Sequence, residues 1–121
     1  IPVEKILHVV TRAKPQAISF EASNPRHAHE WRKWRDADIP EDKVLMPGVI
    51  DSVTNFIDHP EGVAERICKF ADIVGRERVL AGSDCGFATF AGFGKVDSEI
   101  AYAKLGALAE GARIASETLW P

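Results

Sequence analysis

The sequence predicts an α/β protein built around a parallel β-sheet, and two observations carry this prediction. Three short apolar runs, residues 17–22, 44–50 and 78–82, show no clean alternation of polar and apolar side chains. Strands with this composition are buried on both faces, as in a parallel sheet. Segments with apolar residues at helical spacing separate the runs, so the order is helix-strand-helix-strand-helix-strand-helix.

The first two helices are predicted from their prolines. A helix is expected over residues 2–13, where Pro2 suits a first helical position. Asn24 and Pro25 have the pattern of an N-cap and a first-turn proline. A short second helix is therefore expected to run from this point to Trp34.

The last two helices have clearer boundaries. Residues 58–61, Asp-His-Pro-Glu, open the third helix, and its apolar residues recur at helical spacing until Gly75 stops it. Asp97 can cap the fourth helix, and Glu99 stands in its first turn, where a carboxylate interacts favourably with the helix dipole.

Three parallel strands cannot close a barrel and leave two open edges. The chain is either a small open sheet or needs strands from another segment or subunit. It begins at Ile1 instead of an initiator Met and enters a helix almost at once. We therefore expect residues 1–121 to be a single partial domain that associates with a missing part or forms a homo-oligomer.

Composition and charge argue against several classes of function. The chain is 45% hydrophobic and 27% charged, as in ordinary soluble globular proteins. Nucleic-acid binding would need clustered Lys and Arg, but the tightest group, residues 31–35, is followed by acidic residues that cancel it. No stretch has the length of a membrane span, and no signal-peptide pattern opens the chain. Two cysteines fit a cytoplasmic protein better than a disulfide scaffold.

An ionisable side chain follows each predicted strand. Glu21 follows the first, Asp51 the second, and Asp84 and Cys85 the third. Because the carboxyl ends of parallel strands share one face, we expect these residues to converge there, with Asp51 and Asp84 as candidate substrate-binding residues. Glu21 and Cys85 would suit zinc. Two ligands are not a site, however, and the alternative that Glu21 faces a helix dipole while Cys85 is simply buried stays open.

The histidines do not complete a metal site by their spacing. His27 and His29 are two positions apart and would point to different sides of a helix, so one is expected to pack or hydrogen-bond locally and the other to be solvated. His8 is expected to be structural, and Cys68 to lie in the core. His59 is most simply a helix-start residue and is kept as a candidate catalytic residue.

The segment from Cys85 to Val96 is rich in glycine and phenylalanine. It follows a strand, is expected to expose aromatic side chains, and is longer than a tight connection, which is typical of a functional loop. Its glycines lack a Walker or dinucleotide fingerprint, so phosphate binding is only weakly indicated.

Three stretches together resemble one known family. They are residues 17–27 (AISFEASNPRH), 47–51 (PGVID) and 82–87 (GSDCGF). They are similar to the C-terminal catalytic barrel of cobalamin-independent methionine synthase. The likeness is closer to shorter relatives described as 5-methyltetrahydropteroyltriglutamate–homocysteine methyltransferases, and it runs from about Ile1 to Trp120. The resemblance implies about three β/α units at the C-terminal end of a TIM (β/α)8 barrel.

The resemblance also implies a zinc site and a reaction. The family holds zinc with a His-x-Cys pair, a Glu and a second Cys. Glu21 matches the family's Glu, and Cys85 matches its second Cys. No His-x-Cys occurs in this chain, so that pair would lie before Ile1. Zinc converts the homocysteine thiol to a thiolate, which attacks the methyl group on N5 of a methylated folate while an acid protonates the leaving nitrogen.

One position departs from the family pattern. The larger methionine synthases carry a proton-donor histidine where this sequence has Val53. Thiol alkylation is therefore the general expectation, and methionine synthesis is its favoured instance.

Three alternatives stay open. A related barrel alkylates another thiol, for instance by opening an epoxide with coenzyme M. A chain without the His-x-Cys pair could be a non-catalytic fragment that binds no metal tightly. A metal-free barrel of the uroporphyrinogen decarboxylase type would require clustered arginines at the strand ends, where only Arg26 is so placed.

Overall fold

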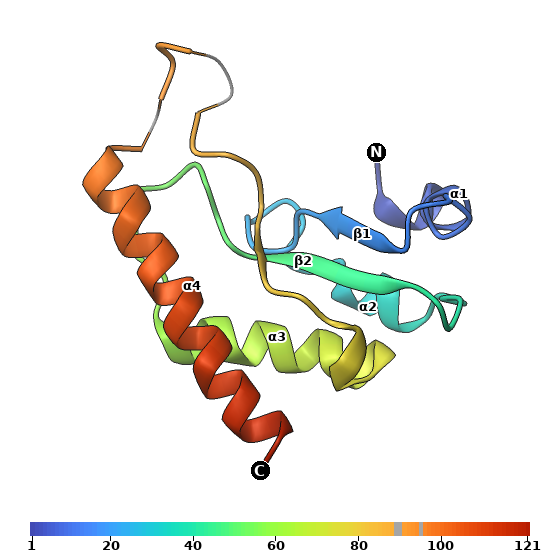
Figure 1. Ribbon diagram of the computed structural model, residues 1–121. Helices are drawn as coiled ribbons and strands as arrows, with labels where there is room; N and C mark the ends of the chain where they lie inside the picture. The colour runs from blue at the N-terminus through green and yellow to red at the C-terminus, as the bar shows by residue number, and fades with distance from the viewer. Residues whose placement is uncertain (89–90, 95) are drawn as a thin grey trace.

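The computed structural model describes residues 1–88, 91–94 and 96–121. A three-stranded parallel sheet packs against helices, which confirms the predicted α/β class (Figure 1). Three residues of the predicted functional loop, Thr89, Phe90 and Lys95, lie outside the described residues. The elements follow in the order η1 (Val3–Lys5), α1 (Leu7–Val10), β1 (Ala17–Phe20), α2 (Trp31–Arg35), β2 (Val44–Ile50), α3 (Pro60–Val74), η2 (Arg76–Arg78), β3 (Gly82–Ser83) and α4 (Ser98–Leu119).

The sheet has the strand order β1-β2-β3, and both pairings are parallel. The third strand is much shorter than the predicted run of residues 78–82. After the 3-10 turn η2, Val79 makes a single bridge to Leu45, and the regular pairing begins only where Gly82 lies beside Gly48. Pro47 stands between these two points of contact on β2. It has no N–H to donate, which explains the interruption.

Burial differs between the strands of the sheet. β2 has four consecutive buried residues, Pro47 to Ile50, as predicted for a strand covered on both faces. In β1, Ile18 is buried against the helices, but Ala17 and Ser19 are exposed. The prediction of two covered faces is therefore wrong for β1. That strand pairs on one side only, and its second face carries small side chains.

The N-terminal helices are shorter than predicted. Residues 2–13 form the 3-10 turn η1 and the single turn α1, with a break at Ile6. The helix predicted to start at Pro25 begins only at Trp31. Residues 25–30 form turns instead, although the side chain of Asn24 accepts the backbone N–H of Arg26 as an N-cap would. Asn24 is also bound by Asp84 through its backbone N–H and Nδ2, so a distant residue fixes this turn.

The boundaries of the two long helices agree with the prediction. His59 caps α3, its Nδ1 accepting the N–H of Glu61 at 3.3 Å, and Gly75 ends the helix with a φ of 96°. Asp97 caps α4 by accepting the N–H of Glu99 at 2.9 Å. Within the described ranges, neither these helices nor the shorter ones are both long and apolar enough to cross a membrane.

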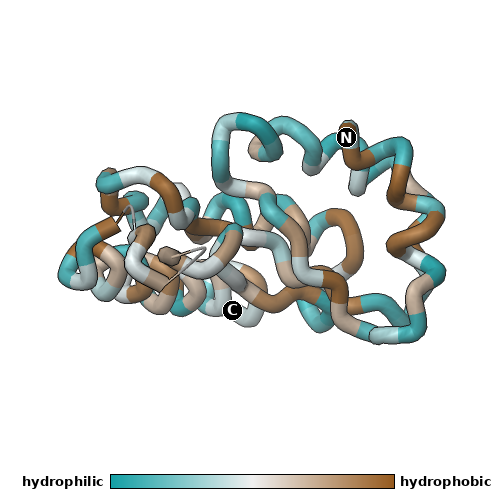
Figure 2. Tube along the Cα trace, turned by 90° about the horizontal axis from the view of Figure 1, so that it is seen from above, coloured by the Kyte–Doolittle hydropathy of each residue, from teal (hydrophilic) through white to brown (hydrophobic). Residues whose placement is uncertain are grey.

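Two apolar clusters form the core between the sheet and the helices. In the first, Phe20 of β1 stacks on Trp34 of α2 at 3.9 Å between ring centroids and meets Phe70 of α3 edge-on. In the second, Val49 and Val63 lie where β2, α3 and α4 meet. The trace in Figure 2 alternates between apolar and polar segments along its length, as expected when each element buries one side.

Candidate metal centre

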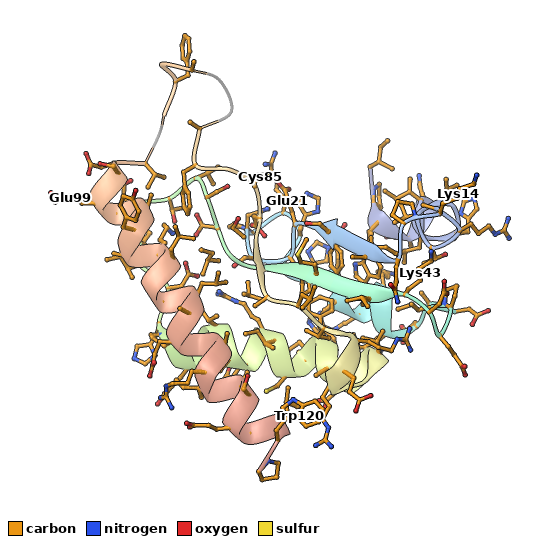
Figure 3. All side chains as sticks on the ribbon, in the orientation of Figure 1. Lys14, Glu21, Lys43, Cys85, Glu99 and Trp120 are labelled. Atoms are coloured by element: carbon orange, nitrogen blue, oxygen red, sulfur yellow. The ribbon has the colours of Figure 1, made fainter. Side chains whose placement is uncertain are left out.

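Glu21 and Cys85 meet at the carboxyl ends of the strands. Cys85 Sγ donates a hydrogen bond to Glu21 Oε1 at 2.8 Å, although the two residues are 64 positions apart. Figure 3 shows the two side chains next to each other above the sheet. Glu21 directly follows β1, and Cys85 lies two residues after β3. The predicted convergence of these two residues is therefore present.

The shared proton sets the charge of both groups. The hydrogen bond to Glu21 raises the pKa of the Cys85 thiol to about 11, and burial and the charges of Glu21 and Asp84 act in the same direction. The same hydrogen bond lowers the pKa of Glu21 against the opposing effect of burial. Without a cation, the pair is thus a neutral thiol beside a carboxylate.

His27 orients Glu21 and was not predicted to belong to the site. Its Nε2 lies 3.2 Å from Glu21 Oε2, and its Nδ1 lies 2.8 Å from Oε2 of the buried Glu30. Asn24 Nδ2 also donates to Glu21 Oε2 at 3.2 Å. One oxygen of Glu21 is thereby held by the protein, and the other faces Cys85. His29 is exposed, as expected for one member of the histidine pair.

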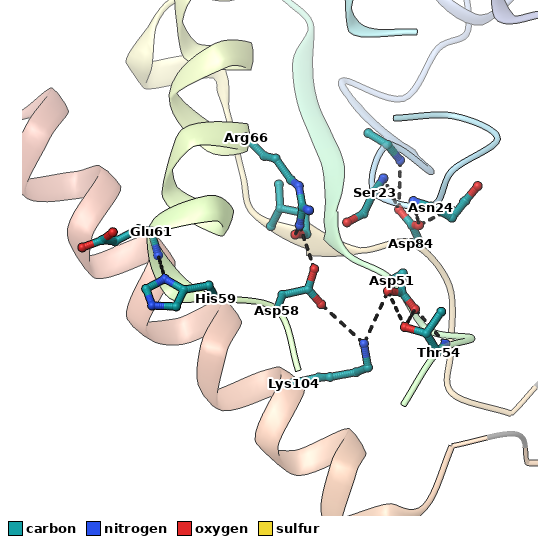
Figure 4. A network of polar contacts seen from close by, with 12 residues as sticks. Ser23, Asn24, Asp51, Thr54, Asp58, His59, Glu61, Arg66, Asp84 and Lys104 are labelled. Carbon is teal, nitrogen blue, oxygen red and sulfur yellow. Dashed lines mark hydrogen bonds and ion pairs between the residues drawn. The ribbon is translucent and has the colours of Figure 1, made fainter. Parts of the chain in front are cut away.

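Asp84 anchors the loop that follows β1. Its buried carboxylate accepts the backbone N–H groups of Ala22, Ser23 and Asn24 at 2.7–2.9 Å, and Asn24 Nδ2 at 3.0 Å (Figure 4). Asp84 immediately precedes Cys85, so these bonds tie the two halves of the candidate centre together. Substrate binding by Asp84 stays a prediction. In this arrangement both carboxylate oxygens are engaged with the loop.

Asp51 lies in a second polar network at the end of β2. Its carboxylate accepts the N–H of Val53 and both the N–H and the hydroxyl of Thr54 at 2.8–3.0 Å. Partial burial would raise the pKa of Asp51, but these bonds and the charge of Lys104 outweigh burial and lower it. Its role in binding substrate also stays a prediction.

Lys104 of α4 joins this network from the buried side. Its side chain is 0% exposed, and Nζ lies 3.5 Å from Asp51 Oδ2 and 3.4 Å from Asp58 Oδ2. Arg66 of α3 binds Asp58 Oδ1 and the carbonyl oxygen of Val49, both at 2.8 Å (Figure 4). The network ties α3 and α4 to the end of β2. No sequence pattern indicated it, because its members are far apart along the chain.

A cavity of about 260 Å³ opens beside the thiol-carboxylate pair. Its lining includes Val53, which stands where the family pattern has a proton donor and is 51% exposed. His59 is not part of this lining, and its Nδ1 is used to cap α3. A catalytic role of His59 therefore has no support from its position. The lining residues are Glu21, Arg26, Ser52, Val53, Cys85, Gly86, Phe87 and Phe93.

The donor pair suits zinc in type and direction. A zinc ion takes thiolate sulfur at about 2.3 Å and carboxylate oxygen at about 2.0–2.2 Å, which places two such donors about 3.6 Å apart in a tetrahedral site. Cys85 Sγ and Glu21 Oε1 are 2.8 Å apart with a proton between them. If Cys85 Sγ and Glu21 Oε1 moved apart from 2.8 Å to about 3.6 Å, a zinc ion could take the place of the thiol proton. Within the described part of the chain, no group of three or more His, Cys, Asp or Glu side chains is arranged for a metal.

The architecture is that of a partial β/α barrel: three β/α units whose parallel strands carry the candidate centre at their carboxyl ends. One solved structure with a similar architecture is a B12-independent methionine synthase from Shewanella sp. W3-18-1 in complex with selenomethionine. The two superimpose with a TM-score of 0.72 at 22% sequence identity. This likeness of fold confirms the predicted partial barrel.

The match covers 97% of this chain and 31% of that chain, so residues 1–121 span about a third of its length. No protein-family model and no curated protein matches the sequence.

Proposed function

We propose that this chain supplies Glu21 and Cys85 as two ligands of a zinc ion in a cytoplasmic thiol methyltransferase. The favoured reaction transfers a methyl group from a 5-methyltetrahydrofolate-type donor to homocysteine and gives methionine. The observation that carries the proposal is the 2.8 Å contact between Cys85 Sγ and Glu21 Oε1. The contact lies at the carboxyl ends of the strands, where barrels of this class place their chemistry. The likeness of fold to a methionine synthase supports the same interpretation.

Each side chain has a distinct part in this proposal. Cys85 gives up its proton and binds the metal as a thiolate, and Glu21 binds through Oε1. His27 and Asn24 hold Glu21 Oε2, so that the carboxylate keeps its orientation when the thiol proton leaves. Zinc, when bound, would lower the pKa of a substrate thiol so that the thiolate forms near neutral pH.

Two further ligands are needed to complete a zinc site of this kind. We propose that an upstream His-x-Cys pair, or another part of the assembled enzyme, provides them. The position of Val53 favours stating the reaction in its broader form, alkyl transfer to a thiol. Its isopropyl side chain lines the cavity and has no proton to give to a leaving nitrogen. The proton must then come from another group.

The zinc content of the protein that contains these residues tests the assignment of the ligands. We expect about one equivalent of zinc in the wild type, measured by elemental analysis after exhaustive dialysis. Cys85→Ser should lose most of it, because removing one of the few protein ligands of a zinc ion lowers its affinity steeply.

Cys68→Ser is the matched control. Cys68 is the second cysteine of the chain, and it lies half-buried on α3 rather than at the strand ends. The Cys68→Ser variant should retain its zinc. Equal zinc content in Cys85→Ser and the wild type would show that Cys85 is not a ligand.

A further inference from the structure

Among the residues that the structure describes, Arg26 is the one cationic side chain in the lining of the cavity beside Cys85. It is exposed, and no other described residue accepts a hydrogen bond from its guanidinium or forms an ion pair with it. The other charged member of the lining, Glu21, is already bound by Cys85, His27 and Asn24. The guanidinium therefore has its donors free to bind a ligand.

The loop that carries Arg26 is held in place before any ligand arrives. The N–H of Arg26 donates to Asn24 Oδ1 at 3.1 Å, and Asn24 is in turn held by the buried carboxylate of Asp84 through its backbone N–H at 2.7 Å and through Nδ2 at 3.0 Å. Asp84 is bonded to Cys85 through the chain, so the thiol and the guanidinium are presented by one connected unit. These bonds fix the backbone at Arg26 beside the thiol, and the exposed guanidinium can turn toward a ligand in the cavity.

One side of the cavity is apolar, although Glu21 and Ser52 also belong to the lining. Val53, Phe87 and Phe93 line it together with the thiol and the guanidinium, and Phe93 is 77% exposed. Such a cavity matches a small molecule with a short alkyl chain and one anionic end. Guanidinium binds carboxylates through paired N–H groups, which makes it well suited to such an end.

We propose that Arg26 is a specificity-determining residue that binds the carboxylate of a short-chain acceptor thiol in the cavity between Cys85 and Phe93. The inference rests on the proposed function, since it names the class of thiol that reaches the candidate zinc ligands. The carboxylate lies on Arg26, the alkyl chain contacts Val53 and the phenylalanines, and the thiol points to Glu21 and Cys85.

The test uses Cys85 of the zinc-free, 121-residue chain as a reporter of anion binding. Iodoacetate and iodoacetamide have nearly the same size and react in the same way, with carbon–sulfur bond formation and loss of iodide, but only iodoacetate is anionic. The ratio of their rates at Cys85 cancels any change in the thiolate fraction, because both reagents attack the same thiolate. Peptide mass analysis separates the product at Cys85 from that at Cys68.

We expect Arg26→Gln to lower the ratio of iodoacetate to iodoacetamide rates about three- to fivefold, the effect of losing one partly screened charge contact. Arg12→Gln is the control, because it removes the same charge from an exposed position just after α1, outside this cavity. Its ratio of iodoacetate to iodoacetamide rates should equal that of the wild type within error. In urea, where the loop is unfolded, Arg26→Gln and the wild type should give equal ratios.

An unchanged ratio in folded Arg26→Gln would overturn the inference, and so would an equal fall in Arg12→Gln. Neither result bears on the zinc ligands, which are tested by the metal content of Cys85→Ser. Conversely, if zinc content proves independent of Cys85 but the ratio falls in Arg26→Gln, the proposed function fails and the anion site remains.

Discussion

Gly48 of β2 lies directly against Asp84, whose side chain passes across β2 to reach the loop after β1. A Cβ atom at position 48 would lie 2.6 Å from Asp84 Cα and would overlap its carboxylate. The absence of a side chain at Gly48 is therefore what allows Asp84 to accept three backbone N–H groups from residues 22–24. Through this contact, a glycine in the middle strand supports the position of both candidate ligands.

The first prediction is that Gly48→Ala destabilises the chain by about 1–3 kcal/mol, the usual cost of overpacking a buried site. Urea denaturation measures the change. Gly82→Ala on the neighbouring strand is the control. Its Cβ would meet the flexible side chain of Met46 at 3.1 Å and would make only an ordinary van der Waals contact with backbone, at 3.5 Å from the carbonyl oxygen of Pro47. If the two variants were equally stable, the close approach of Asp84 to Gly48 would not contribute to the free energy of unfolding.

Replacing each of two glycines of α4 by alanine should change the stability of the chain in opposite directions. A Cβ at Gly111 would lie 2.9 Å from the carbonyl oxygen of Pro60 and would overlap Val63, whereas a Cβ at Gly106 would meet nothing within 4 Å. Gly106→Ala should stabilise the chain by about 0.5–1 kcal/mol through helix propensity. Gly111→Ala should destabilise it by about 1–3 kcal/mol by forcing α3 and α4 apart.

Thermal unfolding monitored by circular dichroism distinguishes these cases. A rise in Tm for both variants would mean that α4 does not pack closely on α3 at Gly111.

Lys104→Met should destabilise the chain by about 3 kcal/mol. The substitution keeps the apolar stem but removes the charge between Asp51 and Asp58, whose side chains are 14% and 9% exposed, and leaves two nearly buried carboxylates without that partner. Lys33→Met is the control, since its ammonium is half exposed and lies 3.9 Å from Glu4. Its effect should stay within about 0.5 kcal/mol. Similar urea midpoints for the two variants would contradict a structural role for the buried network.

The reactivity of the Cys85 thiol should increase only at high pH, because its hydrogen bond to Glu21 raises the pKa of the thiol. In the zinc-free chain with Cys68→Ala, the rate of alkylation by iodoacetamide should rise up to about pH 11, the pKa of Cys85. Glu21→Gln removes the carboxylate that holds the proton, so the midpoint should move toward 9, the ordinary thiol value. At pH 8 the variant should therefore react faster than the parent. An unchanged midpoint would mean that Glu21 does not control the thiol.

Local patterns were reliable where local interactions decide the structure. The starts of α3 and α4 follow from His59 and Asp97, and the end of α3 follows from Gly75, because caps and a positive φ involve only neighbouring residues. The start of α2 was misplaced. The turn at Asn24 is held by Asp84, sixty residues away, and no local pattern contains that contact.

The candidate site divides in the same way. Apolar runs, helical spacing and an ionisable residue after each strand determined the α/β class and the convergence of Glu21 with Cys85, because parallel strands place their carboxyl ends on one face. Only the tertiary structure decided that His27 and Asn24 hold one oxygen of Glu21, that Asp84 is engaged with the loop, and that Arg26 lines the cavity. Side-chain contacts across strands depend on register and on the space left by a residue such as Gly48, and both arise only when the sheet assembles.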